Sequence, residues 1–289
     1  MKLIAFLCPF PSGGRSGRGY FEKRRYLWHS YFKIFQSRLM EVKPVIEVRD
    51  LVKIYKGSGE KALGGISLSV PEGEFLGLLG PNSAGKTTFT SIVCGLISPT
   101  SGSVKIFDTD VTLSLRKVKN RIGLVPQEIA LYSGLTVKEN IYFYGHLMGY
   151  HGEELKRRAG SLIEIFNLEE HLSKFVEHCS GGIKRRVNLI SGIIHDPELL
   201  ILDEPTLGVD IQLREMIFGH LAEMNRKGTT IIYTTHYMKE AELLCSRVNI
   251  IDHGSLIANG TPAELVAGNE GCEDLGEVFL KMTGRDLRD

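Results

Sequence analysis

The sequence predicts an α/β fold in which a mostly parallel sheet is joined by an antiparallel β subdomain and by a helical insertion. Short apolar runs, such as residues 199–202 and 230–235, alternate with stretches of helical periodicity, which is typical of parallel βαβ units. Earlier in the chain, residues 46–48 and 66–70 alternate apolar and polar side chains, as half-buried antiparallel strands do. Residues 128–195 show mainly helical patterns and are therefore interpreted as the insertion.

Residues 79–88, with the sequence LGPNSAGKTT, fit the phosphate-loop pattern G-x-x-x-x-G-K-[ST]. In this pattern backbone N–H groups wrap the phosphates, while Lys86 reaches the β/γ oxygens and Thr87 ligates Mg²⁺. A strand pattern precedes the loop and a helical pattern follows it, so the loop lies at a helix N-terminus, where the helix dipole favours an anion. These features predict a P-loop (RecA-like) core. The alternative is a glycine-rich turn that happens to carry a lysine.

Composition restricts the class of protein. The 289 residues are 43% hydrophobic, which is ordinary for a globular chain. No run approaches the roughly 18 to 20 apolar residues that cross a bilayer, so any membrane role would be peripheral. The five cysteines lie far apart without a C-x-x-C pattern, which favours reduced thiols and gives little support to metal ligation.

The first 39 residues differ from the rest of the chain. They hold eight Lys/Arg and one acid, whereas residues 40–289 hold 27 bases and 33 acids. The mildly acidic body argues against a nucleic-acid-binding face, which needs clustered positive charge. The extension, which is rich in aromatic residues, is interpreted as disordered or as lying upstream of a true start at Met40. A basic helix on an anionic membrane surface, striped by Trp28 and Phe32, is the alternative.

The helical insertion contains a second candidate anion site. Residues 136–139 form a capping box that opens a helix with Ile141 and Leu147 on its predicted buried face. Further along, Ser180, Gly181 and Gly182 precede another helical pattern. A serine and two glycines at a helix start are suited to binding an anion, although a plain helix cap has the same residues.

Polar residues follow several predicted strands of the parallel sheet. Asp203 and Glu204 end the apolar run 199–202, and acids at this place suit a phosphate site, because Mg²⁺ prefers oxygen ligands and hydrolysis needs an oriented water. Acids at a solvated strand end are the alternative. Gln127 and His236 follow two other strands, and parallel strands gather their ligands at their carboxyl ends. We therefore expect these residues to lie close to the phosphate loop.

Taken in order, the motifs GPNSAGKTT, Gln127, CSGGIKRR, LLILDEP, GVD and TTHYMKEAELL resemble those of the ATP-binding cassette (ABC) ATPase family. The resemblance covers about residues 45–260, which are interpreted as the main part of a nucleotide-binding domain over 40–260 with a C-terminal tail over 261–289. The chain is most similar to cytosolic subunits of bacterial transporters that export drugs, lipids or polysaccharides through a separate membrane partner.

The resemblance implies a nucleotide-binding role for each matched residue. Tyr55 would stack on the adenine. The phosphates would be cradled by the loop residues Gly80, Pro81, Asn82, Ser83, Ala84, Gly85, Lys86, Thr87 and Thr88. Ser180, Gly181 and Gly182 would act on the ATP that is bound by an opposite subunit, and Asp210 would help to couple the two sites.

Besides Lys86 and Thr87, four residues are implied to act in hydrolysis and in Mg²⁺ binding. Glu204 would polarise the attacking water, and His236 would hold the γ-phosphate. Gln127 would touch both Mg²⁺ and the water, and Asp203 would support Mg²⁺ through its shell. Two ATP molecules would be sandwiched in a head-to-tail dimer, so that closure depends on ATP and release depends on hydrolysis.

Three positions depart from the family pattern. Ser83 stands where glycine is usual, and a Cβ there would strain a backbone with positive φ by an amount of order 1 kcal/mol. Weaker nucleotide binding with retained hydrolysis is expected from this change. Cys179 replaces a usual leucine, which we expect to affect packing only, and Leu207 occupies a position that is often serine.

The resemblance also implies partners and a location. An integral membrane permease would hold the chain at the cytoplasmic face of the inner or plasma membrane, and a second nucleotide-binding subunit, a copy of this chain or a related cassette, would complete the dimer; no nucleic acid is expected. A non-transport ABC ATPase is one alternative function. A nucleotide-dependent regulatory module without turnover is another, which the presence of Glu204 and His236 disfavours.

Overall fold

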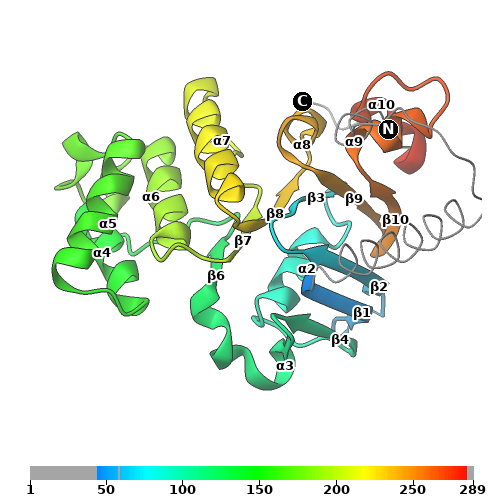
Figure 1. Cartoon of the computed structure of the whole chain (residues 1–289), viewed down its shortest axis with the longest axis horizontal. Coiled ribbons are helices and arrows are strands. Elements are labelled where there is room, and N and C mark those ends of the chain that lie inside the picture. Colours follow the sequence, from blue (N-terminus) through cyan, green and yellow to red (C-terminus); the bar gives the residue numbers. More distant parts are fainter. Residues whose placement is uncertain (1–43, 58, 285–289) are drawn as a thin grey trace, which may run out of the picture. The chain divides into compact units, whose positions relative to one another are not determined.

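The structure is a computed structural model, and it describes residues 44–57 and 59–284. The strands of this part form two sheets of different kinds (Figure 1). The predicted basic extension, residues 1–39, lies outside the described residues. The domain limits drawn from the sequence at 40–260 and 261–289 stay predictions.

The first sheet is antiparallel throughout and has the strand order β2-β1-β4-β5. Its strands are β1 (Pro44–Ile54), β2 (Lys61–Pro71), β4 (Ser101–Ile106) and β5 (Thr109–Asp110). The buried residues Ile46 and Val48 of β1 pair with Val70 and Leu68 of β2. The alternation seen in the sequence therefore reflects a sheet that buries one face.

The second sheet has the order β10-β9-β3-β8-β7-β6, and all neighbouring pairs are parallel except the terminal hairpin of β9 and β10. Its strands are β3 (Phe75–Leu79), β6 (Ile122–Val125), β7 (Leu199–Asp203), β8 (Thr230–Thr235), β9 (Arg247–Asp252) and β10 (Ser255–Gly260). The fold class predicted from the sequence is confirmed.

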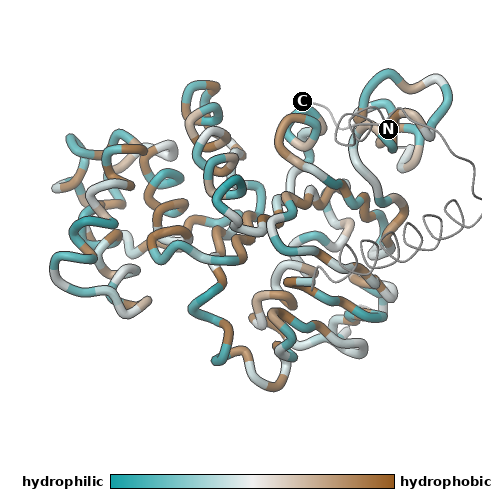
Figure 2. Tube along the Cα trace, viewed as in Figure 1, coloured by the Kyte–Doolittle hydropathy of each residue, from teal (hydrophilic) through white to brown (hydrophobic). Residues whose placement is uncertain are grey.

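The central strands β3, β7 and β8 are fully buried and mostly apolar because each contributes to two hydrophobic cores. Phe75 and Leu79 of β3 belong to one core, which also contains residues of the helical insertion. Leu76 and Leu78 point to the other face, where they pack with residues of the antiparallel sheet. Figure 2 accordingly shows hydrophobic colour running along these strands. A strand that is buried on both faces reads as a continuous apolar run rather than as an alternating one.

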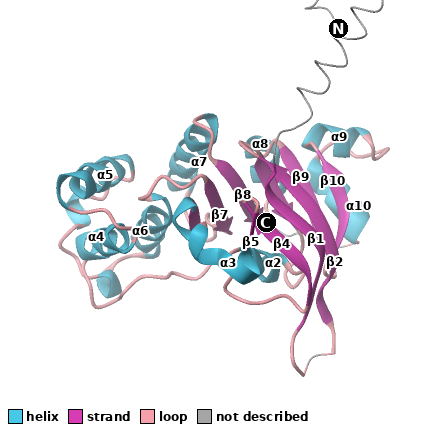
Figure 3. Ribbon diagram, turned by 60° about the horizontal axis from the view of Figure 1, so that its bottom comes forward, coloured by secondary structure: helices cyan, strands magenta, loops and turns pink. Residues whose placement is uncertain are grey.

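Helices surround the parallel sheet, and α4 to α6 lie together beside α7, away from the antiparallel strands (Figure 3). The helices are α2 (Lys86–Val93), α3 (Val111–Ser114), α4 (Val137–Leu147), α5 (Gly152–Ile165), α6 (Gly181–Ile193), α7 (Ile211–Arg226), α8 (Met238–Leu244), α9 (Pro262–Ala267) and α10 (Leu275–Thr283). Over the residues that the structure describes, none of these helices combines the length and the apolar character needed to cross a membrane.

Helix α4 starts where the sequence predicted, but one residue of its predicted buried face is exposed. Thr136 and Glu139 form the predicted capping box, in which each side chain bonds to the other residue's backbone N–H. Ile141 is fully buried, whereas Leu147 is 64% exposed. The assignment of Leu147 to the buried face was wrong, because a residue six positions after Ile141 is turned about 120° away from it on a helix. The buried face continues to Gly145 instead.

Candidate functional site

The phosphate loop connects the end of β3 to the start of α2, as predicted. Two of its glycines are required by close contacts. A Cβ on Gly80 would lie 2.3 Å from the carbonyl oxygen of Ile251. Gly85 has φ +109, and a Cβ there would lie 2.5 Å from the carbonyl oxygen of Ala62. The loop is therefore held tightly between β2 and the end of β9.

The N-terminus of α2 is built differently from most other helix starts in the protein. Helices α4, α7, α9 and α10 each begin with a side chain that accepts a hydrogen bond from a first-turn N–H group. Helix α2 has Gly85 as its N-cap residue, lacks a side-chain cap and carries no acidic residue in its first turn. Its first N–H groups are consequently suited to bind an anionic ligand, which the helix dipole also favours.

Lys86 is buried at this helix start, with only 6% of its surface exposed. Its ammonium donates hydrogen bonds to the carbonyl oxygens of Gly80 (2.7 Å) and Pro81 (3.2 Å), and it lies 3.8 Å from Glu204 Oε1. Burial lowers the pKa of Lys86, and the nearby carboxylates of Glu204 and Asp203 oppose that effect. The side chain thus supplies a positive charge at the mouth of the loop, where phosphate oxygens would bind.

The acids at the end of β7 reach the same place. Glu204 is 7% exposed and has φ 47, a left-handed conformation that costs a non-glycine residue about 1–3 kcal/mol. Its backbone N–H donates to the backbone and side-chain oxygens of Thr234. The Oε2 atom of Glu204 lies 3.1 Å from Nδ1 of His236, and Asp203 Oδ1 accepts a hydrogen bond from the hydroxyl of Thr234. Strands β7 and β8 therefore bring Asp203, Glu204 and His236 together.

A cavity of about 330 Å³ lies over the loop. Gln127, from the segment after β6, lines it together with Glu204. Next to the cavity the hydroxyl of Tyr55 lies 3.3 Å from Oγ1 of Thr88, so that the tyrosine ring stands beside the helix start. The cavity is lined by Ala62, Pro81, Asn82, Ser83, Ala84, Gly85, Lys86, Thr87, Thr88, Gln127 and Glu204. Of these, Ala62 was not predicted.

The remaining predicted residues form a second group outside this cavity. Ser180 is the N-cap of α6, and Asp210 is the N-cap of α7, where its carboxylate accepts the Leu213 N–H at 2.8 Å. The two helix starts are neighbours, because a Cβ on Gly182 would lie 3.7 Å from the side chain of Leu213. One chain therefore presents two separate groups of predicted residues, one around Lys86 and one around Ser180.

Contacts from α6 hold the segment that carries Gln127, and sequence reasoning missed them. The buried Arg185 donates to the carbonyl oxygen of Gln127 at 2.8 Å. Asn188 is fully buried, accepts the Ala130 N–H at 3.0 Å and donates to the carbonyl oxygen of Pro126 at 3.3 Å. The only sequence signal was that both polar residues lie in an otherwise apolar helical pattern. These bonds connect the Ser180 helix to the Gln127 segment.

A glycine-rich loop at an uncapped helix start, a buried lysine and two strand-end acids together define a P-loop nucleoside triphosphatase. A sequence profile of the ABC transporter family matches residues 63–207, and the chain belongs to this family. The predicted recognition as an ABC ATP-binding protein, with ATP as its nucleotide and ATP hydrolysis as its activity, is confirmed.

Similar proteins include two curated ATP-binding proteins and one solved structure. The linearmycin resistance ATP-binding protein LnrL of Bacillus subtilis (strain 168) is 46% identical over 232 residues, which are 80% of this chain and 73% of LnrL. The Nod factor export ATP-binding protein I of Paraburkholderia xenovorans (strain LB400) is 39% identical, with 78% and 75% covered. A dimeric ATP-binding cassette in a post-hydrolysis state with ADP and Pi superposes with a TM-score of 0.70 at 27% identity, covering 75% of this chain and 98% of that one.

Proposed function

We propose that two copies of this chain form a head-to-tail dimer that binds two Mg²⁺-ATP molecules and powers the export of a substrate through a membrane permease. The observation that carries the proposal is the convergence of Lys86, Glu204 and His236 at the mouth of the phosphate loop. A positive charge, a carboxylate and an imidazole at that place supply the positioning and charge stabilisation on which phosphoryl transfer depends.

Each residue of the first group has a proposed role. Lys86 binds the β/γ oxygens, and the N–H groups of residues 80–88 surround the phosphates. Glu204 accepts a hydrogen bond from the attacking water, and His236, held 3.1 Å from Glu204, donates to the γ-phosphate. Gln127 helps to orient the water, and Tyr55 stacks on the adenine. The adenine is proposed to lie beside Thr88, because the hydroxyl of Tyr55 contacts this residue.

The residues present fit a magnesium ion. The hydroxyl of Thr87, the amide of Gln127 and the carboxylate of Asp203 are the hard oxygen donors that Mg²⁺ prefers, and the hydroxyl of Thr234 holds one oxygen of Asp203 in place. A bound Mg²⁺ would neutralise the charge that develops on the phosphate oxygens. We propose that Thr87 and Gln127 ligate the ion and that Asp203 supports its hydration shell.

A second copy of the chain is proposed to complete each site. Ser180, Gly181 and Gly182 do not line the cavity above Lys86, yet Ser180 caps a helix whose N-terminus is suited to an anion. A head-to-tail partner would bring this helix start to the γ-phosphate, with Asp210 close to the contact. The solved cassette that this chain resembles is a dimer, which supports the arrangement.

An exposed apolar patch supports a permease partner. Ile129, Tyr132, Phe143 and Leu147 are all at least 36% exposed, and the rings of Tyr132 and Phe143 meet edge to face at 4.8 Å. The patch continues into the Gln127 segment, because the hydroxyl of Tyr144 bonds to the carbonyl of Ala130. A permease docked here would sense the Gln127 segment directly and would hold the chain at the cytoplasmic face of the membrane. Export is proposed because the P. xenovorans relative carries this function in its name.

The proposal is tested by the ATPase rate of Glu204→Gln beside that of the wild type. The substitution keeps the size of the side chain and removes its negative charge, so we expect a rate at least 100-fold lower with nucleotide binding retained. An unchanged rate would remove Glu204 from its role and would favour a regulatory module. A membrane protein that co-purifies with the tagged wild type, and that is lost with Leu147→Glu, would identify the permease.

A further inference from the structure

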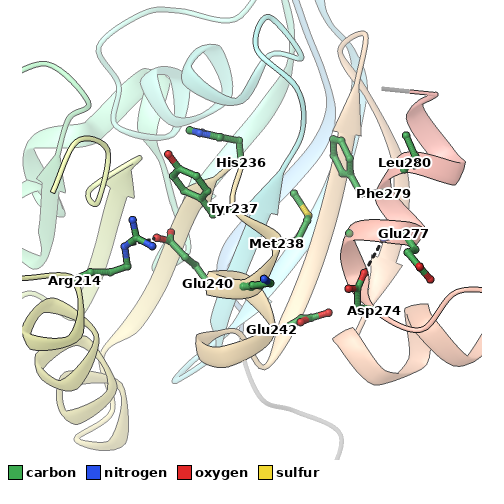
Figure 4. A pocket seen from close by; sticks show the side chains of 12 residues that line it. Arg214, His236, Tyr237, Met238, Glu240, Glu242, Asp274, Glu277, Phe279 and Leu280 are labelled. Atoms are coloured by element: carbon green, nitrogen blue, oxygen red, sulfur yellow. Dashed lines mark hydrogen bonds and ion pairs between the residues drawn. The ribbon is translucent and has the colours of Figure 1, made fainter. Parts of the chain in front are cut away.

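A buried carboxylate lies behind the Glu204–His236 pair. Glu240 of α8 is 3% exposed and accepts hydrogen bonds from three hydroxyl groups. These are Thr206 Oγ1 at 2.9 Å, the Tyr233 hydroxyl at 2.8 Å and Thr235 Oγ1 at 2.9 Å. Figure 4 shows that Arg214 of α7 points toward the same carboxylate, and its Nε lies 3.5 Å from Glu240 Oε1.

This network gives the buried carboxylate three hydrogen-bond donors and one nearby positive charge. A carboxylate that leaves water is strongly destabilising unless donors and a positive charge surround it. Burial and the charge of Glu240 raise the pKa of Tyr233 well above its ordinary value, so the phenol keeps its proton and remains a donor. Three hydroxyls and one guanidinium thus converge on Glu240, although its side chain does not line the cavity above the phosphate loop.

The donors come from the two segments that carry the reacting pair. Thr206 lies two residues after Glu204, in the segment that leads from β7 to α7. Thr235 directly precedes His236, and its Oγ1 also accepts the N–H of Tyr237 at 3.0 Å. Through the hydroxyl of Thr206, Glu240 holds the segment that follows Glu204. Through the hydroxyl of Thr235, it holds the turn that carries His236. Because Glu204 itself has the strained φ of 47, its segment needs such an anchor to stay in place.

We propose that Glu240 is a positioning residue for ATP hydrolysis, which sets the distance between Glu204 and His236 by binding Thr206 and Thr235. The inference rests on the proposed roles of Glu204 and His236 and extends them to residues that do not touch the nucleotide. Arg214 supplies a positive charge beside Glu240, and Tyr233 supplies a further hydrogen-bond donor. A misplacement of about 1 Å in such a pair lowers a rate by up to about 100-fold.

The first test uses Thr206, whose hydroxyl can be removed without a change in shape. We expect Thr206→Val to lower kcat for ATP about 10- to 100-fold with an unchanged KM, because Glu240 acts on the pair and not on nucleotide binding. Thr206→Ser keeps the hydroxyl and should retain a rate close to that of the wild type. Equal rates for the valine and serine variants would overturn the proposal.

Glu240→Gln tests the acceptor itself and should show the same loss in kcat. Glu242→Gln is the matched control, because Glu242 lies on the same helix but bonds to the N–H of Leu275. We expect the control to keep the wild-type kcat. A kcat loss shared by Glu242→Gln, or a change in KM with an intact kcat in Glu240→Gln, would show that α8 acts only by stabilising the fold.

A double substitution separates this inference from the proposed function. In a His236→Ala background Glu240→Gln should cause no further loss in kcat, because the pair that it positions is already broken. A full additional loss would show that Glu240 acts through another group and would overturn the positioning role. If His236→Ala and Glu204→Gln both kept the wild-type rate, the proposed function would fail instead.

Discussion

Ser83 offers a measurable consequence of the phosphate loop's geometry. Ser83 is exposed, and its backbone has φ 72. Glycine adopts this left-handed conformation without strain, whereas a residue with a Cβ does not. Ser83→Gly should release about 1 kcal/mol of backbone strain. At 1.4 kcal/mol for each tenfold change in affinity, a release that is felt only in the bound state corresponds to a Kd for ATP about fivefold lower.

Backbone strain at Ser83 acts either in the folded chain as such or only when a nucleotide is bound. The left-handed conformation belongs to the folded structure, so we expect part of the strain to act in the folded chain before binding. That part should appear as a higher free energy of unfolding of the nucleotide-free chain, and only the remainder as a lower Kd. We therefore expect the two gains to sum to about 1 kcal/mol. The ATPase kcat should stay close to that of the wild type, because Glu204 and His236 are unchanged.

Fluorescence titration with a nucleotide analogue and urea denaturation measure the two parts. Ser83→Ala is the control, because it removes the hydroxyl and keeps the Cβ; it should change neither quantity in the direction of the glycine variant. If Ser83→Gly left both the Kd and the free energy of unfolding at their wild-type values, the strain reasoning would be wrong.

Two further predictions concern the apolar patch and a buried histidine. Leu147→Glu should leave the ATPase rate of the isolated chain unchanged and should abolish stimulation by the permease in reconstituted vesicles; retained stimulation would argue against docking at this patch. Burial lowers the pKa of His195 below its ordinary value of 6.5, so on acidification the imidazole binds a proton in the unfolded chain before it does in the folded one. The free energy of unfolding should therefore fall as the pH drops below 6.5, and His195→Gln should flatten that dependence in urea titrations.

The parts of the fold that were predictable depend on local patterns. The loop 79–88 was recognised because a short motif, a preceding strand and a following helix all agree. The strand around Leu200 was visible because both faces of the sheet are covered, which leaves an unbroken apolar run. Asp203 and His236 were expected near the loop because parallel strands end at one edge, and the structure places them there.

The supporting residues were not predictable, because their roles depend on contacts distant in the sequence. In the sequence Glu240 does not differ from its charged helix neighbours Lys239 and Glu242, and only the structure shows that β8 and the segment after β7 close around it. Arg185 reads as one of several basic residues after Ser180, and only packing brings it to the carbonyl of Gln127. Leu147 was misassigned because the predicted apolar stripe was too wide: six residues after Ile141, it lies about 120° around the helix from that residue.

The shared-site claim is tested most directly by mixing two inactive variants, Ser180→Arg and Glu204→Gln. In a head-to-tail dimer, a pair made of one copy of each variant has one site with both lesions and one intact site. Half of the dimers in an equal mixture are such pairs, so about a quarter of the wild-type ATPase rate should return. A mixture of Lys86→Ala and Glu204→Gln places a lesion in both sites and should stay inactive. No recovery in the first mixture, or equal recovery in both, would contradict a site built from Lys86 of one copy and Ser180 of the other.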